Sequence, residues 1–175
     1  MRIIAGKHRG RTLALFRGTD VRPTADRVKE SLFQILSSRL YGARVLDLFS
    51  GSGALGLESL SRGAAQAEFC DSSAESVALL RKNLAALKET GKIYECDFRV
   101  CLARTQGKYD LIFADPPYKE EYLTEILTVV GERGLLSEEG LVVYESEREE
   151  EGAEGWEKAD ERVYGRTRVS MWRKI

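Results

Sequence analysis

Residues 44–56 have the sequence Arg-Val-Leu-Asp-Leu-Phe-Ser-Gly-Ser-Gly-Ala-Leu-Gly, an apolar run that leads into a loop with three glycines. The apolar run predicts a buried strand, and the pattern from Ala54 to Arg62 predicts a helix that ends at Gly63. The glycine spacing matches G-x-G-x-x-G, which lets the backbone of a strand-to-helix turn approach a ligand closely. The match alone does not identify that ligand, and it also fits a tight turn without one.

Strands and helices are predicted to alternate along the rest of the chain. The strands are expected at 67–71, 92–96, 109–114 and 140–145, and the helices at 73–89 and 120–130. Residues 156–164 and 166–172 have the pattern of two final strands joined by a turn. Strands that alternate with helices predict a mainly parallel α/β sheet, and the final hairpin predicts that the sheet ends mixed.

The first 44 residues are basic, whereas the rest of the chain is acidic. They contain ten Lys or Arg and three acids, against 17 basic and 25 acidic residues in the remainder. Residues 2–16 predict a β-hairpin, and 25–40 a helix that Pro23 can start. A basic end on an acidic body indicates a docking surface for a polyanion. The candidate phosphate contacts are Lys7, Arg9, Arg11, Arg22 and Arg27.

The strand predicted at 109–114 leads into Asp115-Pro-Pro-Tyr118. Proline has a fixed φ and no backbone N–H, so the strand must end there in a rigid turn. Ligands of open α/β sheets bind at this carboxyl edge of the strands. The turn offers a carboxylate, the Pro116 carbonyl and an aromatic ring, which could hold an exocyclic amine and stack its base. Asp115, Pro116, Pro117 and Tyr118 are therefore the predicted catalytic residues.

Three acids at predicted strand ends discriminate between possible ligands. Asp71 lies 20 residues after Gly51, where a carboxylate binds the ribose hydroxyls of an adenosine. Asp47 would repel the pyrophosphate of NAD, but it suits the ammonium and sulfonium of S-adenosylmethionine (SAM). Asp97 could accept from the adenine amino group with Phe98 on the ring, or it could cap the short helix that follows. The pattern favours SAM.

The motifs at 47–63 and 115–118 resemble those of SAM-dependent amino-methyltransferases. Two further segments, Met1-Arg-Ile-Ile-Ala-Gly and residues 21–33, are similar to the RsmD family, which methylates a guanine N2 in bacterial 16S ribosomal RNA. The resemblance implies a class I methyltransferase fold, a Rossmann-like α/β sheet of seven strands with an antiparallel last strand. It also implies that Arg22 to Thr24 lie near cofactor and base, that the substrate is a ribonucleoprotein, and that the protein is a monomer.

The resulting organisation is an RNA-docking hairpin and helix over 1–40 and one compact SAM-binding unit over 41–175. The predicted cofactor contacts are Asp47, Phe49, Ser50, Gly51, Gly53, Asp71, Ser72, Asp97 and Phe98. Thr24 joins the predicted RNA contacts. The partner is 16S rRNA or an assembling small ribosomal subunit.

Cysteine spacing and apolar runs bear on metal content and location. The three cysteines form no C-x-x-C pair, which predicts reduced thiols in a cytoplasmic protein without a metal site. No apolar run approaches the roughly 20 residues needed to span a bilayer, and the N-terminus lacks a signal peptide's apolar region. We expect no association with membranes.

Three other function classes stay open at this point. An adenine-N6 methyltransferase acting on DNA or RNA would share the Asp-Pro-Pro-Tyr turn, but 175 residues leave little room for a separate DNA target-recognition domain. A nicotinamide-dependent oxidoreductase would share the glycines and Asp71, but it has no task for that turn. A non-catalytic RNA-binding module needs only the basic end and leaves the glycine loop unexplained.

Overall fold

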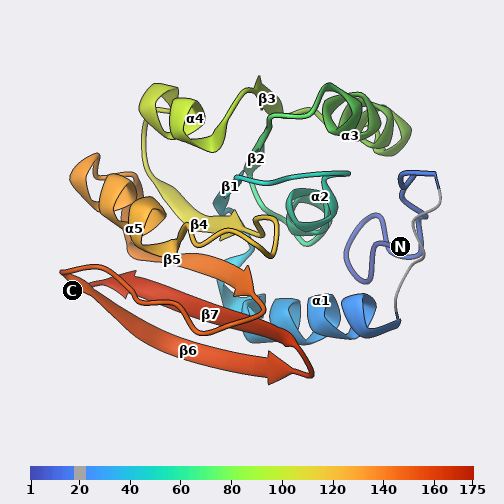
Figure 1. The fold of residues 1–175 in the computed structure, drawn as a ribbon. Coiled ribbons are helices and arrows are strands. Elements are labelled where there is room, and N and C mark those ends of the chain that lie inside the picture. The colour runs from blue at the N-terminus through green and yellow to red at the C-terminus, as the bar shows by residue number, and fades with distance from the viewer. Residues whose placement is uncertain (18–22) are drawn as a thin grey trace.

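The computed structural model describes residues 1–17 and 23–175, in which one sheet of seven strands lies between two layers of helices (Figure 1). The strands are β1 (Arg44–Asp47), β2 (Gln66–Asp71), β3 (Lys92–Glu95), β4 (Tyr109–Ala114), β5 (Leu136–Ser146), β6 (Trp156–Tyr164) and β7 (Thr167–Lys174). The helices are α1 (Pro23–Ile35), α2 (Ala54–Ser61), α3 (Ala74–Leu87), α4 (Phe98–Arg104) and α5 (Leu123–Glu132), with a short 3₁₀ helix at Ser37–Arg39. None of the described helices is both long enough and apolar enough to cross a bilayer.

The strand order is β3-β2-β1-β4-β5-β7-β6. Strands β1 to β5 are parallel, whereas β7 runs antiparallel to both β5 and β6. The predicted α/β sheet with a reversed last strand is confirmed. Because β1, β2, β3 and β4 run the same way, the predicted site residues that follow them lie along one edge of the sheet.

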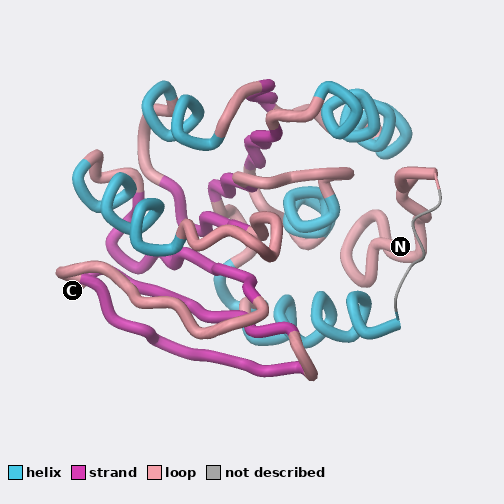
Figure 2. The backbone as a smooth tube through the Cα atoms, in the orientation of Figure 1, coloured by secondary structure: helices cyan, strands magenta, loops and turns pink. Residues whose placement is uncertain are grey.

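Helices cover both faces of the sheet (Figure 2). One apolar cluster packs α1, α2 and α3 against the sheet, and a second packs α4 and α5 against the opposite face. Strand β4 shows why its sequence is a continuous apolar run: Phe113 packs against Phe33 of α1, while Ile112 faces the other cluster. A strand buried on both faces has no need of alternating polar residues.

The N-terminal segment differs from the predicted pair of strands. Its two arms are antiparallel, but they form a single isolated bridge between Arg2 and Thr12. The backbone N–H groups of Ile4 and Ala5 donate to the carboxylate of Glu58 on α2, at 2.9 and 3.2 Å, instead of to a partner strand. The segment therefore packs onto α2 and does not extend the sheet (Figure 1).

Three element boundaries also differ from the prediction. The first helix ends at Ile35, before Ser37 and Ser38, whose side chains compete for backbone hydrogen bonds. Strand β5 begins at Leu136, because Leu136 pairs with Tyr109 before a bulge that the local pattern does not reveal. Helix α5 begins at Leu123, whose N–H donates to Glu150, a residue far along the chain.

Candidate active site

Two loops at the carboxyl edge of the sheet are joined by Asp71. Its carboxylate accepts hydrogen bonds from the N–H groups of Gly51 and Ser73, both at 2.9 Å. Gly51 and Gly53 have φ of 53° and 90°, a region that residues with a side chain rarely adopt. Ser73 caps α3 by accepting from the Ser76 N–H at 3.3 Å.

Asp47 lies buried beneath the glycine loop. One carboxylate oxygen accepts from the Gly56 N–H at 3.1 Å, while Oδ1 and the nearby buried hydroxyl of Ser50 have no hydrogen-bond partner among the described residues. Burial raises the pKa of Asp47 to about 7; the Gly56 hydrogen bond opposes this shift, and the charges of Asp115 and Asp71 add to it. A cationic group that binds here would donate a hydrogen bond to Oδ1 of Asp47 and reduce the repulsion between these acids.

A cavity of about 490 Å³, here called the loop cavity, opens above this loop. Six predicted cofactor contacts line it: Phe49, Gly51, Asp71, Ser72, Asp97 and Phe98. The other three, Asp47, Ser50 and Gly53, are outside its lining. All four residues of the Asp-Pro-Pro-Tyr turn form part of its wall.

Three aromatic rings gather at the loop cavity. Phe49 and Tyr122 are stacked at 4° with their centroids 6.1 Å apart, and Phe98 lies 5.1 and 4.8 Å from them. The Asp97 carboxylate accepts from the Arg99 N–H at 2.8 Å, so the predicted helix cap is confirmed, while the same side chain borders the cavity. Tyr122 was missed by the sequence analysis, although an aromatic residue four positions after Tyr118 was a signal for it.

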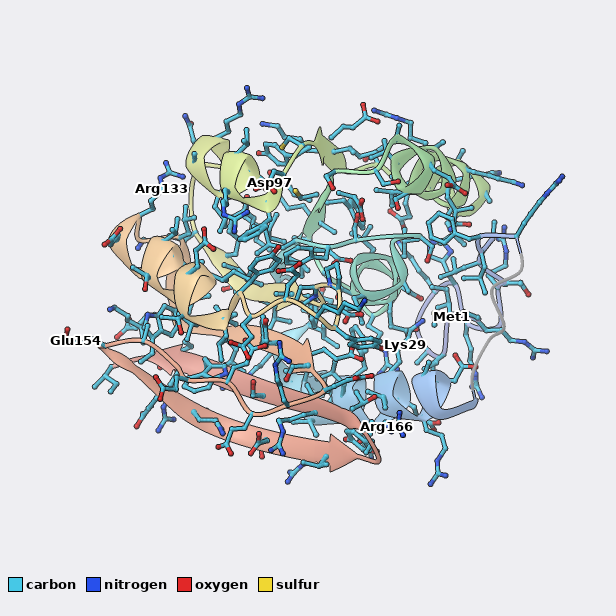
Figure 3. All side chains as sticks on the ribbon, in the orientation of Figure 1. Met1, Lys29, Asp97, Arg133, Glu154 and Arg166 are labelled. Carbon is cyan, nitrogen blue, oxygen red and sulfur yellow. The ribbon has the colours of Figure 1, made fainter. Side chains whose placement is uncertain are left out.

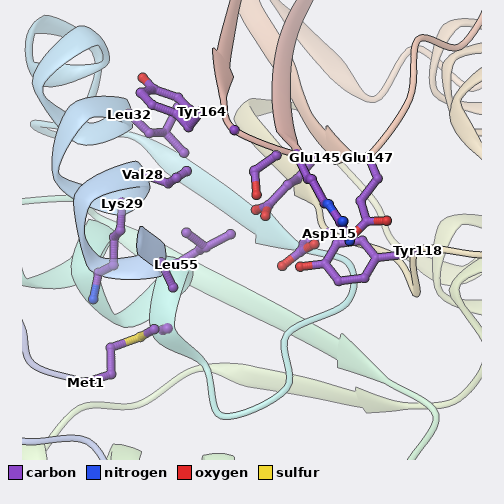
Figure 4. Close-up of a pocket in the computed structure, with 15 residues that line it drawn as sticks. Met1, Val28, Lys29, Leu32, Leu55, Asp115, Tyr118, Glu145, Glu147 and Tyr164 are labelled. Atoms are coloured by element: carbon purple, nitrogen blue, oxygen red, sulfur yellow. The ribbon is translucent and has the colours of Figure 1, made fainter. Parts of the chain in front are cut away.

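A second cavity of about 430 Å³, here called the strand-end cavity, lies on the other side of the turn (Figure 4). Apolar side chains of α1 and α2 form one wall, and acids from the ends of β4 and β5 form the opposite one. The apolar wall includes Val28, Leu32 and Leu55, and the acidic wall includes Asp115, Glu145 and Glu147. Asp115 and Tyr118 line both cavities, so they stand at the boundary between them.

Asp115 and Glu145 are neighbours on adjacent strands, because Ala114 pairs with Tyr144 one residue earlier. Burial raises the pKa of Asp115 to about 7. Burial, and then the charge of Asp115, raise the pKa of Glu145 to about 8. Neither shift has a contribution from a hydrogen bond or a described Lys or Arg. Glu145 was missed by the sequence analysis, because only the strand register places it beside Asp115.

We predict that Glu145→Gln stabilises the protein at alkaline pH. The folded carboxyl keeps its proton up to about pH 8, whereas its ordinary pKa is 4.5, so the wild-type protein loses stability as the pH rises between these values. The variant should therefore gain free energy of unfolding at pH 9, on the order of 1–3 kcal/mol, and gain nothing below pH 4. Urea unfolding at several pH values measures this, with exposed Glu138→Gln as control. An equal difference at every pH would contradict the prediction.

The predicted RNA contacts have different surroundings. The ammonium of Lys7 lies 2.6 Å from Glu89, and Arg11 donates to the Ala86 carbonyl at 2.7 Å, so both also contact the end of α3. His8, between them, is half-buried against Glu89. The side chains of Arg9 and Arg27 are exposed. Arg22 lies outside the described residues, as does the side chain of Thr24.

Arg166 is a basic residue near the site that the sequence analysis did not select. It lies in the turn between β6 and β7, beside α1 (Figure 3). A hydrogen bond between the hydroxyls of Ser31 and Tyr164 fastens this turn to α1. Arg166 is exposed and, like Lys29, borders the strand-end cavity. Spacing along the chain gave no signal for either placement.

Comparison with known proteins places this arrangement in context. A family model described as "Conserved hypothetical protein 95" matches residues 1–173. The "Ribosomal RNA small subunit methyltransferase D" of Escherichia coli K12 is 39% identical over 150 residues, which cover 85% of this chain and 76% of that protein. The Bacillus subtilis protein YlbH is 38% identical over 182 residues, covering 99% of each. The solved structure of Escherichia coli yhhF has a TM-score of 0.90 and 36% identity, covering 99% of this chain and 97% of that one.

Proposed function

Because this chain belongs to the RsmD family, we propose that it transfers a methyl group from SAM to the exocyclic N2 of a guanine in 16S ribosomal RNA. The observation that carries the proposal is the shared wall of the two cavities, formed by Asp115 and Tyr118. A donor in one cavity and a base in the other would meet at the Asp-Pro-Pro-Tyr turn. Neither a nicotinamide oxidoreductase nor a non-catalytic RNA-binding module would need the Asp-Pro-Pro-Tyr turn between two cavities.

The loop cavity fits SAM by its donor and acceptor set. The Asp71 carboxylate would hold the ribose hydroxyls, and Phe49, Phe98 and Tyr122 would surround the adenine with Asp97 at its amino group. The unmet Oδ1 of Asp47 would attract the ammonium from beneath the glycine loop. When bound, SAM supplies an electrophilic methyl group on a sulfonium. The clustered acids favour that positive charge and disfavour a pyrophosphate.

The Asp-Pro-Pro-Tyr turn would activate the amino group. The N2 lone pair of guanine is delocalised into the ring, which makes it a poor nucleophile. The Asp115 carboxylate and the Pro116 carbonyl would accept the two N2 hydrogens, localise the lone pair and hold it near the roughly 3–3.5 Å attack distance. As positive charge grows on N2, the carboxylate stabilises it and then takes the departing proton. Tyr118, 48% exposed, would stack the flipped base.

The basic N-terminal part, residues 1–40, would dock the RNA. Lys7, Arg9, Arg11, Arg22 and Arg27 would contact phosphates, with Thr24 near the base. Such contacts supply affinity and register, while the base is read in the strand-end cavity. The substrate would be 16S rRNA or an assembling small subunit, and the protein would act as a cytoplasmic monomer.

We expect the triple variant Lys7→Gln, Arg9→Gln, Arg11→Gln to bind RNA with a weaker salt dependence. Each lost phosphate contact lowers the magnitude of the slope of log affinity against log salt by roughly 0.7 to 0.9, so the three substitutions together should lower it by about 2 to 3. Filter binding between low and moderate salt measures the slope. The matched control is the triple variant Arg104→Gln, Lys108→Gln, Lys174→Gln. These three residues lie at the end of α4, just before β4 and at the end of β7, which is the edge of the sheet opposite the Asp-Pro-Pro-Tyr turn. Equal slopes in both triple variants would exclude the hairpin as the docking surface.

A tritiated-methyl assay tests the proposed function. The protein is given labelled SAM with naked 16S RNA, assembling small subunits or DNA, and the labelled base is identified after digestion. N2-methylguanine in ribosomal RNA is the expected product. N6-methyladenine would replace the proposal by the adenine-specific alternative. Calorimetry with SAM and with NADH separates methyl transfer from a nicotinamide reaction, because only the true cofactor should bind.

A further inference from the structure

Glu145 is a titratable group of the strand-end cavity that the proposed methyl transfer does not use. It lies near the end of β5, next to Asp115, and both side chains point toward the same space beside Tyr118 (Figure 4). The shift of its pKa has no contribution from a hydrogen bond or from a described Lys or Arg. A half-buried carboxylate without a donor is poorly solvated, so a ligand that brings an N–H group to it would be favoured.

Guanine carries its donors in a pattern that matches two neighbouring carboxylates. Its N1–H lies beside the N2 amino group on the same edge of the ring, so the two donors need two adjacent acceptors. Adenine has a lone pair at N1 beside its amino group, which an ionised carboxylate would repel, whereas the guanine N1–H favours the ionised form of Glu145 and so would lower its pKa when the base binds. A single acid can hold an amino group of either base, whereas a second acid beside it distinguishes them.

We propose that Glu145 is the residue that selects guanine, by accepting the N1–H of the base whose N2 amino group is held by Asp115 and the Pro116 carbonyl. This inference rests on the proposed function, since it assumes that the strand-end cavity receives the target base. It explains the position of Glu145 one strand away from the catalytic turn. The apolar wall of Val28, Leu32 and Leu55 offers no hydrogen bonds, so those of the base would come from the polar lining of the cavity, which includes the acids and Arg166.

Glu147 provides a matched comparison within the same cavity. It has the same side chain and also borders the cavity, but it follows the end of β5 and is exposed. A hydrogen bond at a solvated carboxylate discriminates little, because water replaces the missing donor. If negative charge alone set the preference for guanine, replacing either glutamate would reduce that preference equally. If recognition of N1–H sets it, only the replacement of Glu145 should reduce it.

The experiment compares two RNAs that differ only at the methylated position, once that position has been mapped by mass spectrometry. One carries guanine and the other 2-aminopurine, which keeps the amino group at C2 but has a lone pair at N1. The wild-type protein should prefer guanine in kcat/KM by on the order of 10² to 10⁴. Glu145→Ala should reduce this preference to about 10 or less, chiefly by slowing the guanine reaction, whereas Glu147→Ala should preserve it.

A preference unchanged in Glu145→Ala would overturn the inference while leaving guanine-N2 methylation intact. If the wild-type protein forms no N2-methylguanine on any RNA, the proposed function itself is refuted, which is a separate result. Should Glu145→Ala fail to fold, Glu145→Gln replaces it, because its amide oxygen can still accept one N–H. The preference of that variant should lie between that of the wild type and the value of about 10 or less expected for Glu145→Ala, and a wild-type preference would count against the inference.

Discussion

Asp115→Ala should abolish nearly all methyl transfer, with kcat lower by about 10³, while the affinity for SAM changes less than about threefold. The substitution removes an acceptor for an N2 hydrogen and the charge that stabilises the transition state. It leaves Asp71, the aromatic rings and the glycine loop in place, because no residue that the structure describes donates a hydrogen bond that shifts the pKa of Asp115. Single-turnover transfer of tritiated methyl groups measures the rate, and calorimetry measures SAM binding.

Loss of folding would not explain such a result. Because burial raises the pKa of Asp115 to about 7, its charge destabilises the folded protein at higher pH, so Asp115→Ala should melt at the same or a higher temperature at pH 8. Asp115→Asn keeps one acceptor oxygen without the charge and should retain intermediate activity. If Asp115→Ala kept wild-type turnover, the mechanism would have to be abandoned.

Glu58→Gln should lower the free energy of unfolding by about 3–5 kcal/mol. Glu58 is completely buried and accepts from the N–H groups of Ile4 and Ala5, from Lys29 at 3.1 Å and from Arg62 at 2.9 Å. Burial alone would raise its pKa, but the attraction of Lys29 and the hydrogen bonds from Ile4 and Arg62 outweigh it and hold the pKa below its usual value. The glutamine removes the charge and leaves the buried Lys29 ammonium without its ion-pair partner.

Urea unfolding and amide hydrogen exchange at Ile4 and Ala5 measure the effect of Glu58→Gln. Adding Lys29→Met should recover much of the lost stability, because the two residues form one buried pair and their effects are not additive. Exposed Glu75→Gln on α3 is the control and should change stability by less than about 0.5 kcal/mol. Rapid exchange confined to Ile4 and Ala5, without global destabilisation, would show that Glu58 holds only the N-terminal segment.

Elements with a strong local pattern were predicted well. Residues 109–114 form β4 as predicted, because their run of apolar residues suits only a strand buried on both faces. The helix predicted from residue 73 forms as α3 with Ser73 as its cap, since a cap depends on the next three residues alone. The N-terminal arms were predicted as strands but form only one bridge, because the N–H groups of Ile4 and Ala5 donate to Glu58, 54 and 53 residues away, and not to the other arm.

The amino-acid sequence by itself determined the alternation of strands and helices, the glycine turn before α2, the rigid Asp-Pro-Pro-Tyr corner and the family to which the chain belongs. These depend on residues close together along the chain, where periodicity, backbone freedom and a missing N–H act locally. Only the tertiary structure decided that Glu145 stands beside Asp115, that Tyr122 joins Phe49 and Phe98, and that Glu58 holds the first residues. Such contacts depend on strand register and helix packing, which many weak interactions set together across the whole sheet.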